Sequence, residues 1–278
     1  MLGLAFKRAV LVAAGCGLFP GAGSAQPVTN EEILQHFAYM AFDAQGPADP
    51  PPTIAKWDRP IRIFVRSDAE PKVHRELKSM VEAQAEQLSF ITGLDMEVLD
   101  HGLYNFLVIF AADIYADAAG KYRDIARAFF PDEREMARLL AANRNNRTYC
   151  VVYQVKDEAK RRSGALVLIP YSPDARPTLG CVAERMTQAL GFVRDGRDMR
   201  VSLFGEGARK QRYFALTSQD IVLLGMLYDP KIKHGMTRSE AMPIARDILQ
   251  ALRPLREPPA QPPSPLRRPS DRVRLDPA

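Results

Sequence analysis

The fold of this chain is decided by residues 178–195, TLGCVAERMTQALGFVRD. Its apolar residues recur at steps of three and four, which predicts a helix with one buried face. They are Leu179, Val182, Ala183, Met186, Ala189 and Leu190. The same periodicity aligns Cys181, Glu184 and Gln188 along the other side, with Arg185 beside them. We therefore expect a helix with a packed apolar face and a polar stripe.

Several predicted strands and one long predicted helix precede this helix. The predicted strands are 61–65, 96–99, 104–110, 150–155 and 165–169. A long helix is predicted from Pro71 to Gly93, because apolar residues recur there at helical spacing. Helical patterns follow between 118 and 142. The run 104–110 is nearly continuous in apolar residues, which is typical of a central strand. This order predicts an α+β fold with a mixed, twisted sheet.

Capping boxes mark three further helices, because a threonine followed three residues later by an acidic residue satisfies the first amides of a helix. They begin after Thr29, Thr217 and Thr237, and the last is expected to run through Leu252. Prolines dominate 44–60, which predicts an extended strap between the first helix and the body. Trp57, the single tryptophan, is expected to pin this strap to the core.

The N-terminus has the anatomy of a secretory signal peptide: Lys7 and Arg8, an apolar run over 9–19, and small residues at 23–25. The run is shorter than the ~20 residues that span a bilayer, so we expect cleavage after Ala25 and no transmembrane segment in the mature chain. The alternative is a lipoprotein acylated at Cys16. With the signal peptide cleaved, the expected location is periplasmic or secreted, and the lipoprotein is the alternative to it.

The expected organisation is a signal peptide at 1–25, a helix and strap at 26–60, one domain at 61–253 and a disordered Pro/Arg-rich tail at 254–278. The formal net charge is +5, and removal of the signal peptide leaves +3, of which the tail carries +2. The body is thus nearly neutral, which argues against a nucleic-acid surface.

Two cysteines, Cys150 and Cys181, remain after signal cleavage. In an oxidising compartment they are expected to form a disulfide. The alternative is a reactive thiol at Cys181 beside Glu184, but no histidine lies nearby in sequence to activate it.

Glu184 and Gln188 have the spacing of the two zinc-binding histidines of an H-E-x-x-H motif. In the extended motif of the metzincin proteases, Gly191 stands at the glycine position and Arg194 at the third-ligand position, with Asp195 one residue beyond. Gly191 is also expected to end the helix. The spacing of the motif is present while its ligands are absent.

Zinc hydrolysis needs three imidazole or equivalent ligands and a carboxylate base. The histidines are His36, His74, His101 and His234, and no two of them are four residues apart. Arg185 occupies the position of the base, where a guanidinium cannot accept a proton. The chain also lacks a G-x-S-x-G nucleophile elbow. We therefore expect no metal and no other cofactor.

Three motifs carry a resemblance to known proteins. They are Cys181-x-x-Glu184-x-x-x-Gln188-x-Leu190-Gly191, Leu216-Thr217-x-x-Asp220 and Leu227-Tyr228-Asp229-Pro230. With the order of elements, they resemble the zincin-like metzincin domain and, more closely, a family of exported bacterial proteins that is considered zincin-like. The resemblance covers 61–252 and departs at Arg185, where that family has an acidic residue. It implies two long helices side by side on the sheet, a cleft at the second helix and a smaller C-terminal helical lobe.

The expected function is that of a non-catalytic exported module, which uses the former substrate cleft to hold a peptide, an envelope polymer or a partner protein. The alternative is a peptidase-like hydrolase that uses Glu184 as acid or base with an unusual metal set. The candidate residues of the cleft are Glu184, Arg185, Gln188, Arg194 and Asp195.

Overall fold

The computed structural model describes residues 28–42, 52–113, 150–171, 175–193, 199, 201–205 and 214–256. The predicted signal peptide, Cys16, the predicted helices between 118 and 142, and the chain from 257 onwards lie outside these residues. So do two candidate site residues, Arg194 and Asp195.

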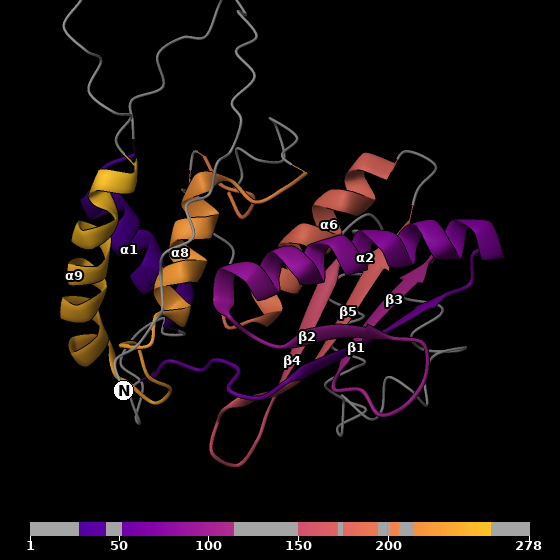
Figure 1. Cartoon of the computed structure of the whole chain (residues 1–278), viewed down its shortest axis with the longest axis horizontal. Helices are drawn as coiled ribbons and strands as arrows, with labels where there is room; N and C mark the ends of the chain where they lie inside the picture. The colour runs from indigo at the N-terminus through magenta and orange to yellow at the C-terminus, as the bar shows by residue number, and fades with distance from the viewer. Residues whose placement is uncertain are drawn as a thin grey trace, which may run out of the picture.

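Within the described residues, five strands form one mixed sheet (Figure 1). They are β1 Ile61–Ser67, β2 Met96–Leu99, β3 Phe106–Ala111, β4 Val151–Lys156 and β5 Arg162–Pro170. The order is β2-β1-β3-β5-β4; β4 runs antiparallel to β5, and the other neighbours are parallel. The predicted mixed sheet of an α+β fold is confirmed.

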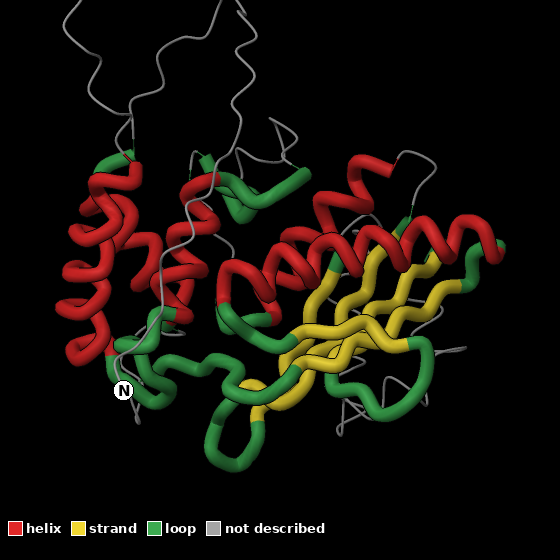
Figure 2. The backbone as a smooth tube through the Cα atoms, in the orientation of Figure 1, coloured by secondary structure: helices red, strands yellow, loops and turns green. Residues whose placement is uncertain are grey.

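The described helices form two groups (Figure 2). They are α1 Asn30–Ala41, α2 Pro71–Thr92, α6 Ala175–Ala189, α8 Ser218–Tyr228 and α9 Arg238–Arg256. Helices α2 and α6 lie side by side over one face of the sheet, and α1, α8 and α9 pack together beyond its end. The two long helices on the sheet therefore agree with the sequence prediction. Helix α9 ends later than predicted, inside the segment assigned to the tail.

The predicted helix starts follow from their capping residues. Thr29 and Glu32 form a reciprocal capping box at α1, and Thr217 and Asp220 form another at α8. At α9, Thr237 donates from its backbone amide and its hydroxyl to a single carboxylate, that of Glu240. In each case the box holds the chain at the point where helical periodicity begins.

The core lies between the sheet and the helices. All six residues of β3 are buried, as the continuous apolar run predicted, and seven of the nine residues of β5 are buried. On the face below the helices, Ile63, Phe106 and Val167 pack with Val182 and Met186 of α6. This apolar layer fixes the height of α6 above the sheet.

The strap before β1 is tied to the C-terminal end of α6. The Trp57 indole is 1% exposed, and its Nε1–H donates to the carbonyl of Ala189 at 2.9 Å. The hydroxyl of Tyr228 donates to the carbonyl of Leu190 at 2.6 Å and accepts from the Trp57 amide at 3.2 Å. Carbonyls that the helix end leaves unpaired are thereby satisfied, and the predicted pinning role of Trp57 is confirmed.

Lys56 ties the same strap to the end of α8. Its Nζ donates to the carbonyls of Leu227 at 3.0 Å and Ile232 at 2.6 Å. Burial, together with the positive charge of Lys233, lowers the pKa of Lys56 to about 8, while Asp229 opposes this shift. The strap therefore joins the sheet layer to the helical group through half-buried polar contacts.

Candidate functional site

Gly191 ends α6 where the sequence predicted, because the chain there has no room for a side chain. Its φ is +140°, and a Cβ at this position would lie 2.8 Å from the carbonyl oxygen of Ala55. Only glycine combines this backbone conformation with so close an approach of the strap. The direction of the end of α6 is thus set by a backbone contact.

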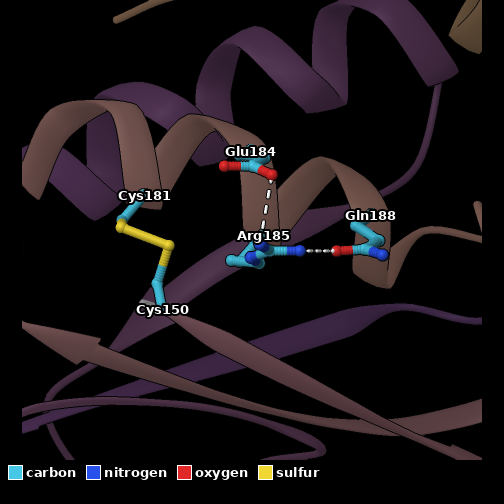
Figure 3. The surroundings of a disulfide bond; sticks show 5 residues. All are labelled: Cys150, Cys181, Glu184, Arg185 and Gln188. Atoms are coloured by element: carbon cyan, nitrogen blue, oxygen red, sulfur yellow. Dashed lines mark hydrogen bonds and ion pairs between the residues drawn. A yellow bond between two sulfur atoms is a disulfide. The ribbon is translucent and has the colours of Figure 1, made fainter. Parts of the chain in front are cut away.

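The Cys150–Cys181 disulfide that was predicted from the sequence is present (Figure 3). Cys150 directly precedes β4, and the two Cα atoms are 5.8 Å apart. Helix α6 begins at Ala175, earlier than predicted, so Cys181 lies in its second turn. The bond ties the start of an outermost strand to the helix that carries the candidate residues.

The predicted division of α6 into an apolar and a polar face is wrong in part. Leu179 is 36% exposed, whereas Arg185 and Gln188 are 7% and 8% exposed. The reason is that α6 packs on two sides, against α2 and against β4 and β5. A helix with two packed sides buries part of its polar stripe as well as its apolar one.

The polar residues of α6 form one interacting set. The guanidinium of Arg185 donates through Nη1 to Gln188 Oε1 at 2.5 Å, and its Nη2 lies 3.1 Å from Glu184 Oε1. Figure 3 shows Arg185 between the two other side chains. The Arg185 guanidinium thus lies between the Glu184 carboxylate and the Gln188 amide oxygen, the two groups that stand at the positions of the zinc-binding histidines. It compensates the charge of Glu184 and donates a hydrogen bond to Gln188.

Gln154 of β4 bonds the backbone at the end of the same helix from the sheet side, a contact that was not predicted. Its Nε2 donates to the carbonyl of Gln188 at 2.6 Å and to the carbonyl of Phe192 at 3.1 Å. In the register of the sheet, Gln154 pairs with Ala165 on the face that α6 covers. A sequence signal did exist, since alternation in 150–155 sets this polar residue on a packed strand face.

The described residues around Glu184 and Gln188 do not fit a zinc site. Among the described residues, no three His, Cys, Asp or Glu side chains are grouped so that they could hold a metal ion. The two oxygens with metal-ligand spacing, on Glu184 and Gln188, both contact the guanidinium of Arg185, and a divalent cation at the same place would be repelled by it.

Asp220, singled out by the resemblance, is a buried structural carboxyl. It accepts hydrogen bonds from the amide of Leu203 at 2.9 Å, the hydroxyl of Ser202 at 2.5 Å and the amide of Thr217 at 2.9 Å. Burial raises the pKa of Asp220, and these donors act in the opposite direction. The carboxyl connects 201–205 to the start of α8.

The fold and site define an α+β domain in which a disulfide holds a sheet-packed helix that bears a Glu–Arg–Gln set. Residues 30–247 match the family described as "Protein of unknown function (DUF2927)", and the chain belongs to that family. The match includes α1 and the strap, which lie before the region covered by the sequence resemblance. A search of curated proteins found no match. Within the described residues, no helix has the length and apolar character needed to cross a membrane.

Proposed function

We propose that this protein is an exported, zincin-like domain that binds rather than cleaves, and that it holds an extended peptide along β4 beside α6. The observation that carries the proposal is the Glu184–Arg185–Gln188 set. It keeps the spacing of a protease helix but places a guanidinium where hydrolysis needs a base and a metal.

The zincin-like part of the proposal is supported by the order of elements. A strand, a long helix, two strands and then a strand pair lead into α6, and Gly191 follows that helix. The disulfide is compatible with an extracellular location, because such bonds persist in oxidising compartments. Together these features support export and a protease-like ancestry.

The loss of hydrolysis follows from side-chain chemistry. Arg185 keeps its proton at physiological pH and cannot act as a general base. Both Glu184 and Gln188 contact the same guanidinium, which leaves neither as a simple donor for a metal. The Glu184, Arg185 and Gln188 side chains are therefore suited to fixing one another's position and balancing charge, and not to activating water.

The peptide is proposed to lie along β4 because this strand is the outermost on its side of the described sheet. A strand at the edge of a sheet can extend it by backbone pairing with an added chain, whose affinity comes from main-chain hydrogen bonds. Gln154 links β4 to α6, and Cys150 ties its first end to the same helix. The docking strand is thus held rigidly next to the polar set.

A hydrolase remains the second candidate for one reason. The side chain of Glu184 is 17% exposed, against 9% for that of Arg185, so the carboxylate is the member of the set that solvent reaches most. An enzyme that used Glu184 as acid or base would cleave a bound peptide rather than release it intact.

Peptides selected from a random displayed library against the mature chain should bind without being cleaved. Hydrogen exchange should then show added protection of the β4 amides, 151–156, and none at the opposite outer strand β2, which is the control within the same molecule. Methylation of alternate peptide amides should weaken binding by about tenfold or more, since each lost main-chain hydrogen bond costs roughly 1 kcal/mol. Protection at β2 alone, or cleavage of the peptide, would refute the proposal.

A further inference from the structure

A second polar pair lies outside α6, at the carboxyl end of β1. The hydroxyl oxygen of Ser67, the last residue of β1, is 2.9 Å from Nδ1 of His74 in the first turns of α2. This separation is within the range that a hydroxyl nucleophile and its general base require. Both partners stand on regular elements, so their relative position is fixed by the sheet and the helix.

This contact differs from those that the hydroxyls of α2 make. Ser79 donates to the carbonyl of Arg75 at 3.0 Å, Ser89 to the carbonyl of Leu94 at 2.6 Å, and Thr92 to that of Leu88 at 2.7 Å. Those hydroxyls bond backbone oxygens, which is the ordinary local behaviour of serine and threonine. The partner of Ser67 is instead a titratable ring nitrogen, which can take the hydroxyl proton.

The surroundings of Ser67 suit an acyl-transfer step. The chain turns directly from β1 into α2, with Pro71 at the first helical position. The first amides of a helix have no intrahelical acceptor, and the side chain of Glu70, the residue before the helix, does not cap them. Pro71 has no N–H and the amide of His74 donates to the carbonyl of Glu70 at 2.8 Å, so the amides that can serve a developing oxyanion in this turn are those of Lys72 and Val73.

Both side chains are half-buried rather than enclosed, so a small solute can reach them. One turn beyond His74, Lys78 pairs with Glu82 at 2.9 Å and with Asp100 at 3.0 Å. The first pair lies within α2, and the second joins α2 to the segment after β2.

We propose that Ser67 and His74 form a nucleophile–base pair that hydrolyses small carboxylic esters. Ser67 Oγ attacks the ester carbonyl carbon while its proton passes to His74 Nδ1. The carbon–oxygen bond to the alcohol then breaks, and the alcohol leaves with that proton. Water adds to the acyl-serine with His74 as base, and the acid is released with the hydroxyl of Ser67 restored. This activity goes beyond the proposed function and is independent of α6.

The test is covalent labelling of the mature full-length chain with a fluorophosphonate, which phosphonylates base-activated serine hydroxyls with loss of fluoride. Peptide mapping should locate the adduct on Ser67, and the same preparation should hydrolyse p-nitrophenyl acetate. The Ser67→Ala variant should lose both signals. His74→Asn keeps an amide near the position of Nδ1 but supplies no base, and it should slow labelling by at least ~100-fold.

Ser79→Ala is the matched control, because it removes a hydroxyl on α2, the helix that carries His74, and this hydroxyl bonds a backbone carbonyl. Its labelling and ester hydrolysis should equal those of the unmodified chain. The proposal is overturned by the absence of an adduct, by equal labelling of Ser67 and Ser79, or by an unchanged labelling rate in a folded His74→Asn variant. Should Ser67→Ala not fold, the mapping of the adduct and the His74→Asn rate decide the question.

Discussion

Replacement of Asp220 by alanine is expected to lower the free energy of unfolding by about 3–5 kcal/mol. The carboxyl is fully buried and accepts hydrogen bonds from two backbone amides and two hydroxyls. Alanine leaves the buried amide of Leu203 and the half-buried amide of Thr217 without this partner, at roughly 1–3 kcal/mol each. Since ~1 kcal/mol shifts the melting temperature of a domain of this size by ~2–4 °C, that temperature should fall by about 6–20 °C.

Asp229→Ala is the control for that experiment. This aspartate stands one residue after α8 and accepts a single exposed hydrogen bond, from the amide of Lys231 at 2.8 Å. Its loss should cost less than about 1 kcal/mol. Equal melting temperatures for the Asp220→Ala and Asp229→Ala variants would contradict the structural role assigned to Asp220.

Removal of the disulfide, in a Cys150→Ala/Cys181→Ala double variant, is expected to cost about 3.7 kcal/mol of unfolding free energy. The bond closes a loop with a sequence separation of 31 residues, and the value is the chain-entropy contribution for a loop of that length. Denaturant titration of the oxidised and double-variant proteins measures the difference directly.

Reduction supplies the control for the disulfide. It should lower the melting temperature of the unmodified chain by on the order of 10 °C and leave the double variant unchanged. Thiol titration of the mature oxidised protein under denaturing conditions should find no free thiol. Two titratable thiols per chain would refute the pairing and restore Cys181 as a reactive group beside Glu184.

Local sequence signals predicted most of the described elements. Capping boxes placed the starts of α1, α8 and α9, and Pro71 and Gly93 bounded α2, because these residues act on the backbone of their own segment. Strand ends differed from the predicted ones by only a few residues. The pairing of Cys150 with Cys181 also followed from the sequence, since only two cysteines remain once the signal peptide is excluded.

The site was harder to predict, because its contacts join segments that are distant in the sequence. The resemblance implied that α2 lies beside α6, but the periodicity of α6 did not show which polar side chains this packing buries, and Arg185 and Gln188 were therefore assigned to the polar stripe. Gln154 reaches α6 from β4, and the Ser67–His74 pair arises where a strand turns into a helix. The spacing of Glu184 and Gln188 was visible in the sequence. That the Arg185 guanidinium lies between their side chains follows only from the folded structure.

The central claim is that the Glu184–Arg185–Gln188 set binds no catalytic metal, and metal analysis of the purified mature protein tests it most directly. After equilibration with zinc and removal of the excess, the chain should retain far less than one zinc ion per molecule, and Glu184→Ala should retain the same amount. One zinc ion per chain that is lost in Glu184→Ala would contradict the binding-module proposal and favour the hydrolase.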